Sequence, residues 1–425
     1  MHIGIQTWGS TGDIRPMIAL AGGLSAAGHD VTVVATSVDD LDYRPLARSL
    51  GVACTMVPEH PRCDIRGLLL KFGGSRNELR LFRVLLAEIL FPFVEEMHRA
   101  ATALVARSDL VIGHFAVHPL KAAAAKARKP HVAVCYWPGL VPTAARAPFP
   151  LPSLGRTLNR LAWGVFNRIL NRGMLRELAP AWTREGLAPP ASVIPGAWFS
   201  DSLNLLAASP LLWPAPPEWG DLYRVCGAFD IPAEAEPEAV PPALDEFLAA
   251  GDPPVFMSFG SSQLLAPERD IALMLEAARL AGVRAIIHTN LPEHPPGPRD
   301  GRLYFVGRTS HRYLFPQCAA IVLHGGAGTA HAAARSGRPA VVVGFSQEQT
   351  SWGAELCRLG VACPPLRRRT VTPARLAARL RDVLGSPALL RRAEEVGQTL
   401  RREDGVAAAV RIIEDACPMM LPRVA

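Results

Sequence analysis

The sequence predicts an α/β protein with two Rossmann-like, doubly wound parallel sheets that face each other across an interdomain cleft. Residues 1–35 have the order strand, glycine-rich loop, helix and strand, which is the βαβ unit of a parallel sheet. The same order restarts at residues 255–282, where an apolar strand runs into Gly260-Ser261-Ser262 and then into a helical pattern. Between them, prolines are concentrated from 210 to 254, a composition typical of a linker.

The chain length supports the same organisation. Its 425 residues suit two domains of about 200 residues each. We expect an N-terminal domain over 1–212, a proline-rich linker over 213–240 and a C-terminal domain over 241–400. The last segment, 401–425, continues a helical pattern, and we expect it to pack back on the N-terminal domain.

Short apolar runs mark the strands, because a parallel sheet covered on both faces needs apolar residues on both sides of each strand. In the first half they lie at 1–5, 31–35, 110–113 and 131–136, and in the second half at 255–259, 285–287, 303–306, 319–323 and 340–343. Helical periodicity connects most of them, and the first helix is predicted to start at Pro16. Strands and helices therefore alternate in both halves, as doubly wound sheets require.

Composition and charge exclude several classes of protein. Hydrophobic residues make up 49% of the chain and charged residues 20%, which is typical of a globular protein and not of a disordered one. The net charge of +7 is scattered, with neither a basic stripe nor a recognisable module, so we expect no nucleic-acid partner. The 8 cysteines form no Cys-x-x-Cys pair, and we expect no metal site and no redox motif.

The sequence also predicts a location. It opens directly with a strand, and it lacks an apolar run of the roughly 18 residues that a membrane-spanning helix needs. Its dispersed cysteines suit a reducing compartment. We therefore expect a cytoplasmic protein that is soluble or peripheral to a membrane.

The most informative segment is the glycine-rich loop His324-Gly325-Gly326-Ala327-Gly328-Thr329, which follows a predicted strand and opens a helix. Glycines let the backbone approach an anion closely, and a helix N-terminus offers unpaired N–H groups and a partial positive charge. The His324 side chain can donate a further hydrogen bond. Together these features favour a pyrophosphate-binding site.

This loop is the first part of a longer signature. With Gly337-Arg338-Pro339 and 347–353 it resembles the C-terminal signature of UDP-glycosyltransferases, in particular the bacterial branch of sterol glucosyltransferases and macrolide and glycopeptide antibiotic glycosyltransferases. Residues 9–16 resemble the Gly-Ser-x-Gly-Asp-x-x-Pro opening of that branch, and 311–316 resemble its segment before the loop. The region from about 54 to 218 matches only loosely.

The resemblance implies a GT-B fold, transfer without a metal, and inversion at the anomeric carbon of the sugar. It implies that the donor is held by residues of several loops: His324, Gly326, Ala327, Gly328, Thr329, Ser10, Gly12, Gly260 and Ser261. Backbone near Thr309 and Ser310 would meet the base, and Glu348 and Gln349 would bond the sugar hydroxyls. In two places the chain departs from the family: Glu348 replaces the usual aspartate, and 330–334 lacks the carboxylate that many relatives use for ribose.

Asp13 is the candidate general base, because it lies on the loop after the first strand and matches the base proposed for the branch. Even a carboxylate of ordinary pKa can accept the proton of an acceptor hydroxyl as charge develops. The alternative is that Asp13 only caps the following helix, with Pro16 in its first turn. His114 follows another strand and would bind the acceptor or assist Asp13, or it is a structural histidine.

Two longer helical stretches, 77–107 and 152–179, lie outside the core pattern. In the second, apolar positions alternate with a set of arginines: Arg156, Arg160, Arg168, Arg172 and Arg176. One interpretation is that both stretches are ordinary packing helices, with arginines that extend into solvent. The other is that these apolar inserts wall an acceptor pocket or contact a membrane surface.

The sequence therefore predicts an inverting, metal-independent glycosyltransferase that moves a sugar from a UDP- or dTDP-sugar to a hydroxyl of a lipophilic acceptor, such as a sterol, terpenoid or polyketide. The nucleotide sugar is a co-substrate, and no separate cofactor is expected. We expect a monomer or a homodimer. Two alternatives stay open: a nucleotide-sugar epimerase of similar fold, and a non-catalytic helper paralogue of a glycosyltransferase.

Overall fold

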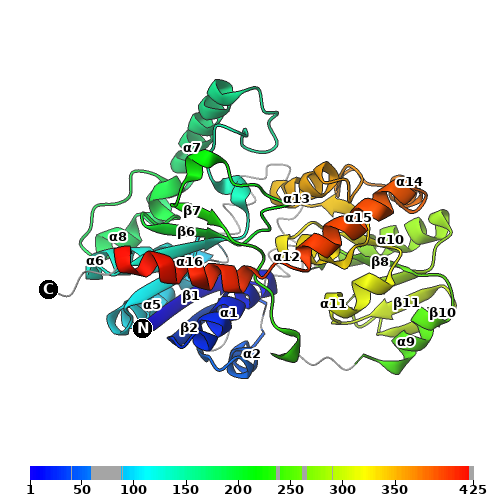
Figure 1. The fold of residues 1–425 in the computed structure, drawn as a ribbon, viewed down its shortest axis with the longest axis horizontal. Helices are drawn as coiled ribbons and strands as arrows, with labels where there is room; N and C mark the ends of the chain where they lie inside the picture. Colours follow the sequence, from blue (N-terminus) through cyan, green and yellow to red (C-terminus); the bar gives the residue numbers. More distant parts are fainter. Residues whose placement is uncertain are drawn as a thin grey trace. The chain divides into compact units, whose positions relative to one another are not determined.

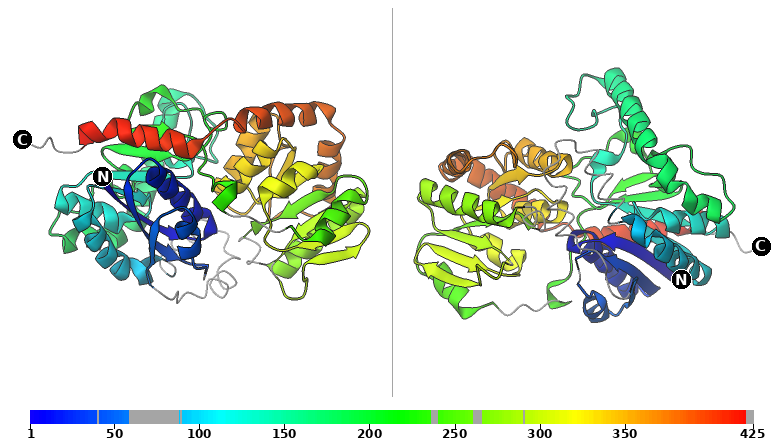
Figure 2. Two further views of the ribbon diagram at one scale, coloured as in Figure 1. Left: turned by 60° about the horizontal axis from the view of Figure 1, so that its bottom comes forward. Right: turned by 180° about the vertical axis from the view of Figure 1, so that it is seen from behind.

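The computed structural model consists of two compact units, which we call unit 1 (Met1–Glu236 with Asp404–Ala425) and unit 2 (Pro237–Glu403). Each has a central sheet with helices on both faces (Figures 1 and 2). The structure describes residues 1–39, 41–58, 88, 90–235, 240–260, 266–289 and 291–420. Ser261, and residues 77–87 and 89 of the predicted helical stretch, lie outside the described residues.

Unit 1 contains a seven-stranded sheet in the order β3-β2-β1-β4-β5-β6-β7. Its neighbouring strands all pair in parallel. The strands are β1 (His2–Gly9), β2 (Asp30–Ser37), β3 (Ala53–Met56), β4 (Leu110–His114), β5 (His131–Cys135), β6 (Leu203–Leu206) and β7 (Tyr223–Val225). Because β1 pairs with both β2 and β4, the winding reverses there, and a topological switch point lies between β1 and β4.

Helices cover both faces of this sheet. They are α1 (Thr11–Ala26), α2 (Arg44–Ser49), α5 (Val94–Arg107), α6 (His118–Ala127), α7 (Arg156–Leu178), α8 (Pro180–Arg184) and α16 (Gly405–Met420). The chain returns to unit 1 through α16, which packs against α1 and is drawn in red beside it in Figure 1. A methyl group on Gly23 of α1 would overlap the Val406 side chain, so this glycine permits the close approach of the two helices.

The start of α1 differs from the sequence prediction. The helix begins at Thr11 and not at Pro16, and Pro16 lies inside it. Ser10 is the N-cap, and its backbone N–H donates to the Asp13 carboxylate at 2.9 Å, so Asp13 is the third helical residue of a capping box. The prediction missed this because a proline near a helix start was taken to mark the first turn.

Unit 2 contains a second seven-stranded sheet, in the order β10-β11-β9-β8-β12-β13-β14. The strands are β8 (Val255–Ser258), β9 (Ala285–His288), β10 (Gly297–Asp300), β11 (Leu303–Val306), β12 (Ala320–Leu323), β13 (Ala340–Gly344) and β14 (Leu366–Arg367). Only β10, which pairs with β11, runs antiparallel among these strands. β8 pairs with both β9 and β12, so a switch point lies between β8 and β12.

The helices of unit 2 are α9 (Pro242–Ala249), α10 (Pro267–Ala281), α11 (His311–Leu314), α12 (Ala327–Ser336), α13 (Gln347–Arg358), α14 (Pro373–Leu384) and α15 (Pro387–Leu400). Fully buried aliphatic and aromatic side chains of α10, α14 and the strands form its core, including Met257, Phe259 and Leu376. No helix in the described part of either unit is long and apolar enough to cross a bilayer.

The prediction of doubly wound parallel sheets is confirmed in both units, but several strands were missed. They are β3, β6, β7, β10 and β14, which have between two and four residues each. Such short runs carry too little apolar pattern to stand out from loops. β7 lies within the segment whose proline content predicted a linker, and it nevertheless pairs with β6 as the last strand of its sheet.

Candidate active site

The predicted site residues gather at the carboxyl edges of the two sheets, one group in each unit. In unit 1, Asp13 follows β1, and His114 is the last residue of β4. In unit 2, Gly260 follows β8, and His324 follows β12. Each pair flanks the switch point of its own sheet, which is where open α/β sheets bind their ligands.

The Asp13 side chain is held in a defined position. Its Oδ2 accepts hydrogen bonds from the backbone N–H of Ser10 at 2.9 Å and from the Ser10 hydroxyl at 3.2 Å. Its backbone carbonyl accepts from the Tyr136 hydroxyl at 2.7 Å and from the Thr7 hydroxyl at 3.3 Å. These contacts fix the first turn of α1 and engage Oδ2, while Oδ1 lies 3.9 Å from Nε2 of His114.

The pKa of Asp13 is raised from 3.8 to about 6, mainly by burial and to a smaller extent by the nearby Asp39 carboxylate, against the two hydrogen bonds from Ser10 that lower it. The side chain still keeps 37% of its surface exposed, so an incoming hydroxyl can reach it. A pKa near 6 makes Asp13 a stronger base than an ordinary aspartate, and yet it is mostly ionised at neutral pH.

His114 lies in an apolar setting next to Asp13. Its ring packs against Phe115 and Tyr136, with centroid distances of 4.6 and 5.4 Å, and its Nδ1 is buried without a hydrogen-bond partner. Burial lowers its pKa to about 3, so the imidazole is neutral at physiological pH. A neutral imidazole at this distance from Asp13 can donate one N–H toward the carboxylate after a small movement, but it does not do so in this structure.

The structure adds residues that the sequence analysis did not name. Tyr136 follows β5 and reaches Asp13, and Asp39 follows β2 and accepts hydrogen bonds from the N–H and the hydroxyl of Thr11 at 2.6 and 2.7 Å. Asp39 thereby anchors the start of α1. Tyr136 is the last residue of one predicted strand and Asp39 follows another, so their position at the carboxyl edge was the available signal.

The glycine-rich loop of unit 2 ends in the free N-terminus of a helix. α12 begins at Ala327, with Gly326 as N-cap, so the N–H groups of residues 327–329 have no acceptor within the helix. A methyl group added to Gly328 would meet no atom of the described residues within 4 Å beyond the backbone of its own helix, so none of them fills the space over this first turn. Such a turn suits an anion, because its amides and the helix dipole both favour negative charge.

His324 packs directly between two of the predicted glycines. A Cβ on Gly260 would lie 2.7 Å from its Cε1, and a Cβ on Gly326 would lie 2.5 Å from its Nε2, so neither position accepts a side chain without displacing the ring. Burial lowers the pKa of His324 to about 4, which keeps the ring neutral, and its Nδ1 is buried without a partner. The loops after β8 and β12 therefore form one surface.

The start of α13 adjoins the same loop. Gly325 has a φ of +91°, and a Cβ there would overlap the backbone carbonyl of Gln349. The side-chain Oε1 of Gln349 accepts from the backbone N–H groups of Phe345 and Ser346 at 2.8 and 3.3 Å, which completes a capping box with Ser346. Gln349 thus has a structural role that the sequence analysis missed, and Glu348 is the second residue of the helix.

The other predicted donor residues lie around these groups. Ser310 is the N-cap of α11, and it follows Thr309 after β11; both are half-buried. Ser10 and Gly12 belong to unit 1, whereas the rest of the predicted donor set belongs to unit 2. Among the described residues, no group of three or more His, Cys, Asp or Glu side chains is placed to hold a metal ion.

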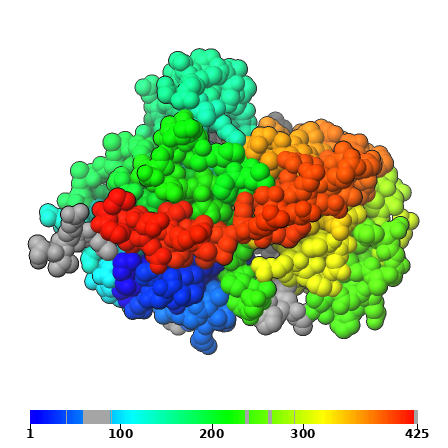
Figure 3. Space-filling view, viewed as in Figure 1, coloured from blue at the N-terminus to red at the C-terminus, as the bar shows by residue number. Residues whose placement is uncertain are grey.

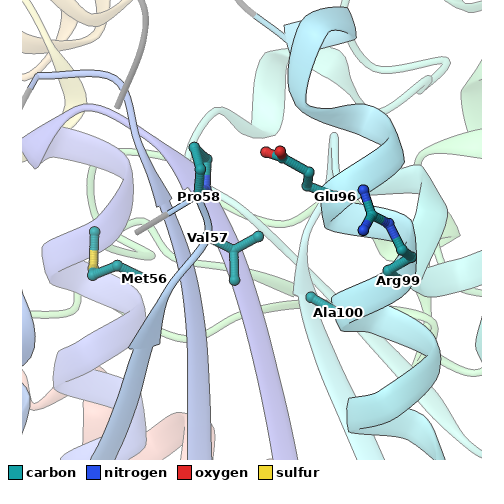
Figure 4. Close-up of a pocket in the computed structure, with 6 residues that line it drawn as sticks. All are labelled: Met56, Val57, Pro58, Glu96, Arg99 and Ala100. Carbon is teal, nitrogen blue, oxygen red and sulfur yellow. The ribbon is translucent and has the colours of Figure 1, made fainter. Parts of the chain in front are cut away.

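Unit 1 also has an open pocket of about 360 Å³ at the end of β3. Figure 4 shows Val57 and Pro58 on one side of it and Glu96, Arg99 and Ala100 of α5 on the other. Its lining is mixed, and it includes neither Asp13 nor His114. Because the chain continues from Pro58 into residues outside the described part, we assign no role to this pocket.

Similar proteins point to one family. Residues 297–411 match the family model described as the C-terminal domain of erythromycin biosynthesis protein CIII-like proteins. The vancomycin aglycone glucosyltransferase of Amycolatopsis orientalis is 30% identical over 436 residues, covering 100% of each chain. The O-mycaminosyltylonolide 6-deoxyallosyltransferase of Streptomyces fradiae is 27% identical, covering 98% of this chain and 97% of its own.

A solved structure agrees in fold. The glycosyltransferase VinC, in complex with dTDP, is 19% identical and has a TM-score of 0.65 over 98% of this chain and 99% of that one. The sequence match to the vancomycin enzyme spans both units, including the predicted base and the glycine-rich loop. The chain therefore belongs to the UDP-glycosyltransferase family, in the branch of antibiotic and sterol glycosyltransferases with the GT-B fold, and it is a glycosyltransferase.

Proposed function

We propose that the protein transfers a sugar from a UDP- or dTDP-sugar to a hydroxyl of a lipophilic natural product, with inversion and without a metal. The observation that carries this proposal is the first turn of α12, whose N–H groups have no acceptor within the helix, beside the buried, neutral His324 at the switch point of unit 2. The VinC structure, which is a complex with dTDP, supports a nucleoside diphosphate as the anion. The relatives named for the vancomycin aglycone and for O-mycaminosyltylonolide support a natural-product acceptor.

In the proposed reaction, unit 2 binds the donor and stabilises the leaving group. The bond between the anomeric carbon and the diphosphate breaks, and negative charge grows on the phosphate oxygen. The amides at 327–329 and an N–H of His324 would stabilise this charge, since preorganised donors act where charge develops. Neutral His324 keeps one N–H for this purpose at physiological pH.

Unit 1 supplies the base. As the acceptor oxygen attacks the anomeric carbon from the face opposite the diphosphate, its proton passes to the Asp13 carboxylate. The free Oδ1 is the atom for this role, because Oδ2 is engaged by Ser10. His114 would position the carboxylate through Nε2, and Tyr136 would position the backbone of the same residue.

The proposed base makes a prediction about pH. The rate constant kcat/KM should rise with pH through an apparent pKa near 6, because only the ionised carboxylate accepts a proton and burial raises its pKa to about 6. The value of kcat/KM at pH 5 should be about one tenth of its value at neutral pH. The measurement is an initial-rate profile with circular dichroism at each pH as a control for folding. If kcat/KM instead decreased with an apparent pKa near 4, the base would be a carboxylate of ordinary pKa.

The sugar-binding pair makes a second prediction. Glu348→Ala should lower kcat/KM for the nucleotide sugar by roughly 10²-fold, while the affinity for the free nucleoside diphosphate stays near normal. Gln349→Ala would also remove a helix cap, which costs about 1 kcal/mol. Gln349→Glu keeps a capping oxygen but replaces the amide donor by a negative charge, so the affinity for the free nucleotide is measured beside it to separate charge repulsion from loss of the sugar contact. If calorimetry found the free nucleotide bound as poorly as the nucleotide sugar, the pair would not contact the sugar.

The proposed function itself is tested by a matrix of UDP- and dTDP-sugars against sterols, terpenoids, macrolides and glycopeptide aglycones, with products read by mass. The screen is run with and without EDTA. Product formation at an unchanged rate in EDTA, with opposite anomeric configuration in donor and product, supports the proposal. Retention of configuration, or activity that requires added manganese, would contradict it.

A further inference from the structure

Unit 1 carries a concentrated set of exposed apolar side chains on α7 and the segment before it. They are 47–65% exposed: Leu151, Leu154, Leu158, Leu161, Val165 and Ile169. Together they are half of the strongly exposed large apolar side chains in the described part of the chain. The four on α7 recur every three or four residues, which puts them on one face of the helix.

This exposed face cannot turn inward, because the opposite face of α7 is already packed. Its buried residues are Asn159, Trp163, Leu170, Met174 and Leu178. The Trp163 indole donates to the backbone carbonyl of Arg146 at 2.8 Å, and the Asn159 amide donates to that of Ala144 at 2.9 Å. Figures 1 and 3 show α7 standing out from the rest of unit 1, so its outer face is open to a partner.

Positive charge surrounds the apolar face. Helix α7 contains five arginines and a single acidic residue, Glu177. All of the arginines are exposed. Arg168 precedes Ile169 on the same side of the helix, and Arg172 and Arg176 continue along that side beyond it. An apolar stripe with arginines beside it is the pattern of helices that lie in the interface of a membrane, where the apolar side chains enter the acyl region and the arginines meet the headgroups.

We propose that the outer face of α7, with Leu151 and Leu154, docks on a membrane surface rich in anionic lipid. Charge complementarity selects this partner. A second copy would present a helix of the same net positive charge, whereas anionic headgroups neutralise the arginines. The inference concerns a surface and does not depend on the identity of the sugar or of the acceptor.

The test is co-sedimentation of the full-length protein with vesicles. Wild type should bind vesicles in which a third of the lipid is phosphatidylglycerol, bind much less to pure phosphatidylcholine, and be released by high salt. Leu161→Glu with Val165→Glu should weaken binding by at least about tenfold, and Arg168→Gln with Arg172→Gln and Arg176→Gln by about 100-fold. The matched control is Leu280→Glu with Leu384→Glu, which makes the same change at exposed leucines of unit 2 and should bind as wild type does.

Thermal midpoints show whether the variants fold, and the lipid and salt dependence of wild type tests the proposal without any variant. Equal sedimentation with neutral and anionic vesicles, or none with either, would overturn it. So would full vesicle binding by both α7 variants. A wild-type dimer in sedimentation equilibrium that Leu161→Glu with Val165→Glu converts to monomer would assign this face to a second copy instead.

Discussion

Asp13→Asn is expected to lower turnover by roughly 10²–10⁴-fold while the protein stays folded and still binds the donor nucleotide. Asparagine keeps the shape of the side chain and an oxygen that can accept the Ser10 N–H, so the capping box survives. What it loses is the ability to take a proton. A purely structural Asp13 therefore predicts little change in rate, and a base predicts a large one.

The thermal stability of Asp13→Asn gives a second measurement on whether Asp13 is a structural residue or a base. The pKa of Asp13 is raised in the fold, so its contribution to stability is present below pH 3.8 and is lost as pH rises through about 6. At pH 7.5 the ionised carboxylate is an unfavourable group, and Asp13→Asn should leave the Tm equal to or above that of wild type. Turnover and Tm are measured together at this pH. Near-wild-type turnover of Asp13→Asn would make Asp13 a structural residue and overturn its role as the base.

Gly328→Ala is expected to weaken nucleoside diphosphate binding by roughly 10- to 100-fold without harming the fold. The added methyl meets no atom of the described residues within 4 Å beyond the backbone of its own helix, and it enters the space over the first turn of α12, where we propose the phosphates bind. Alanine is also the better helix former, so the free energy of unfolding should be unchanged or up to about 1 kcal/mol higher. Calorimetric titration and urea unfolding measure the two quantities.

Two further glycines give this experiment its controls. Gly301→Ala, on the turn between β10 and β11, also meets open space and should leave both affinity and stability unchanged. Gly325→Ala should lose affinity and stability together, because its φ of +91° and the Gln349 carbonyl leave no room for a methyl. If Gly328→Ala bound nucleotide as wild type does, the phosphates would lie elsewhere.

Much of the fold could be predicted because it depends on local pattern. Apolar runs between glycine loops and helical repeats predicted the parallel sheets of both units, and the signature from His324 onward predicted the family. The short strands could not be predicted, because β14 has only two residues and is defined by its pairing with β13. The start of α1 was predicted at Pro16, which was wrong. The helix starts at Thr11 because Ser10 and Asp13 form a capping box there, and Pro16 lies inside the helix.

The proposed base, His114 and the donor residues were named from the sequence, whereas Tyr136 and Asp39 were not, and the roles of all of them stay predictions until the variants are measured. Their properties came from the tertiary structure. Burial raises the pKa of Asp13 and lowers that of His114, and the groups responsible come from separate strands and loops that only folding brings together. No sequence pattern predicts how far folding removes a carboxylate from water, and so none predicts its pKa.

The sequence by itself determined the two doubly wound sheets, the family and the glycine-rich loop, because each depends on residue types at fixed spacing. Only the tertiary structure decided that His324 is held between Gly260 and Gly326, that Gln349 caps its own helix, and which side of α7 is left uncovered. Periodicity shows that a helix has an apolar face, but which face is buried depends on what the rest of the chain packs against it.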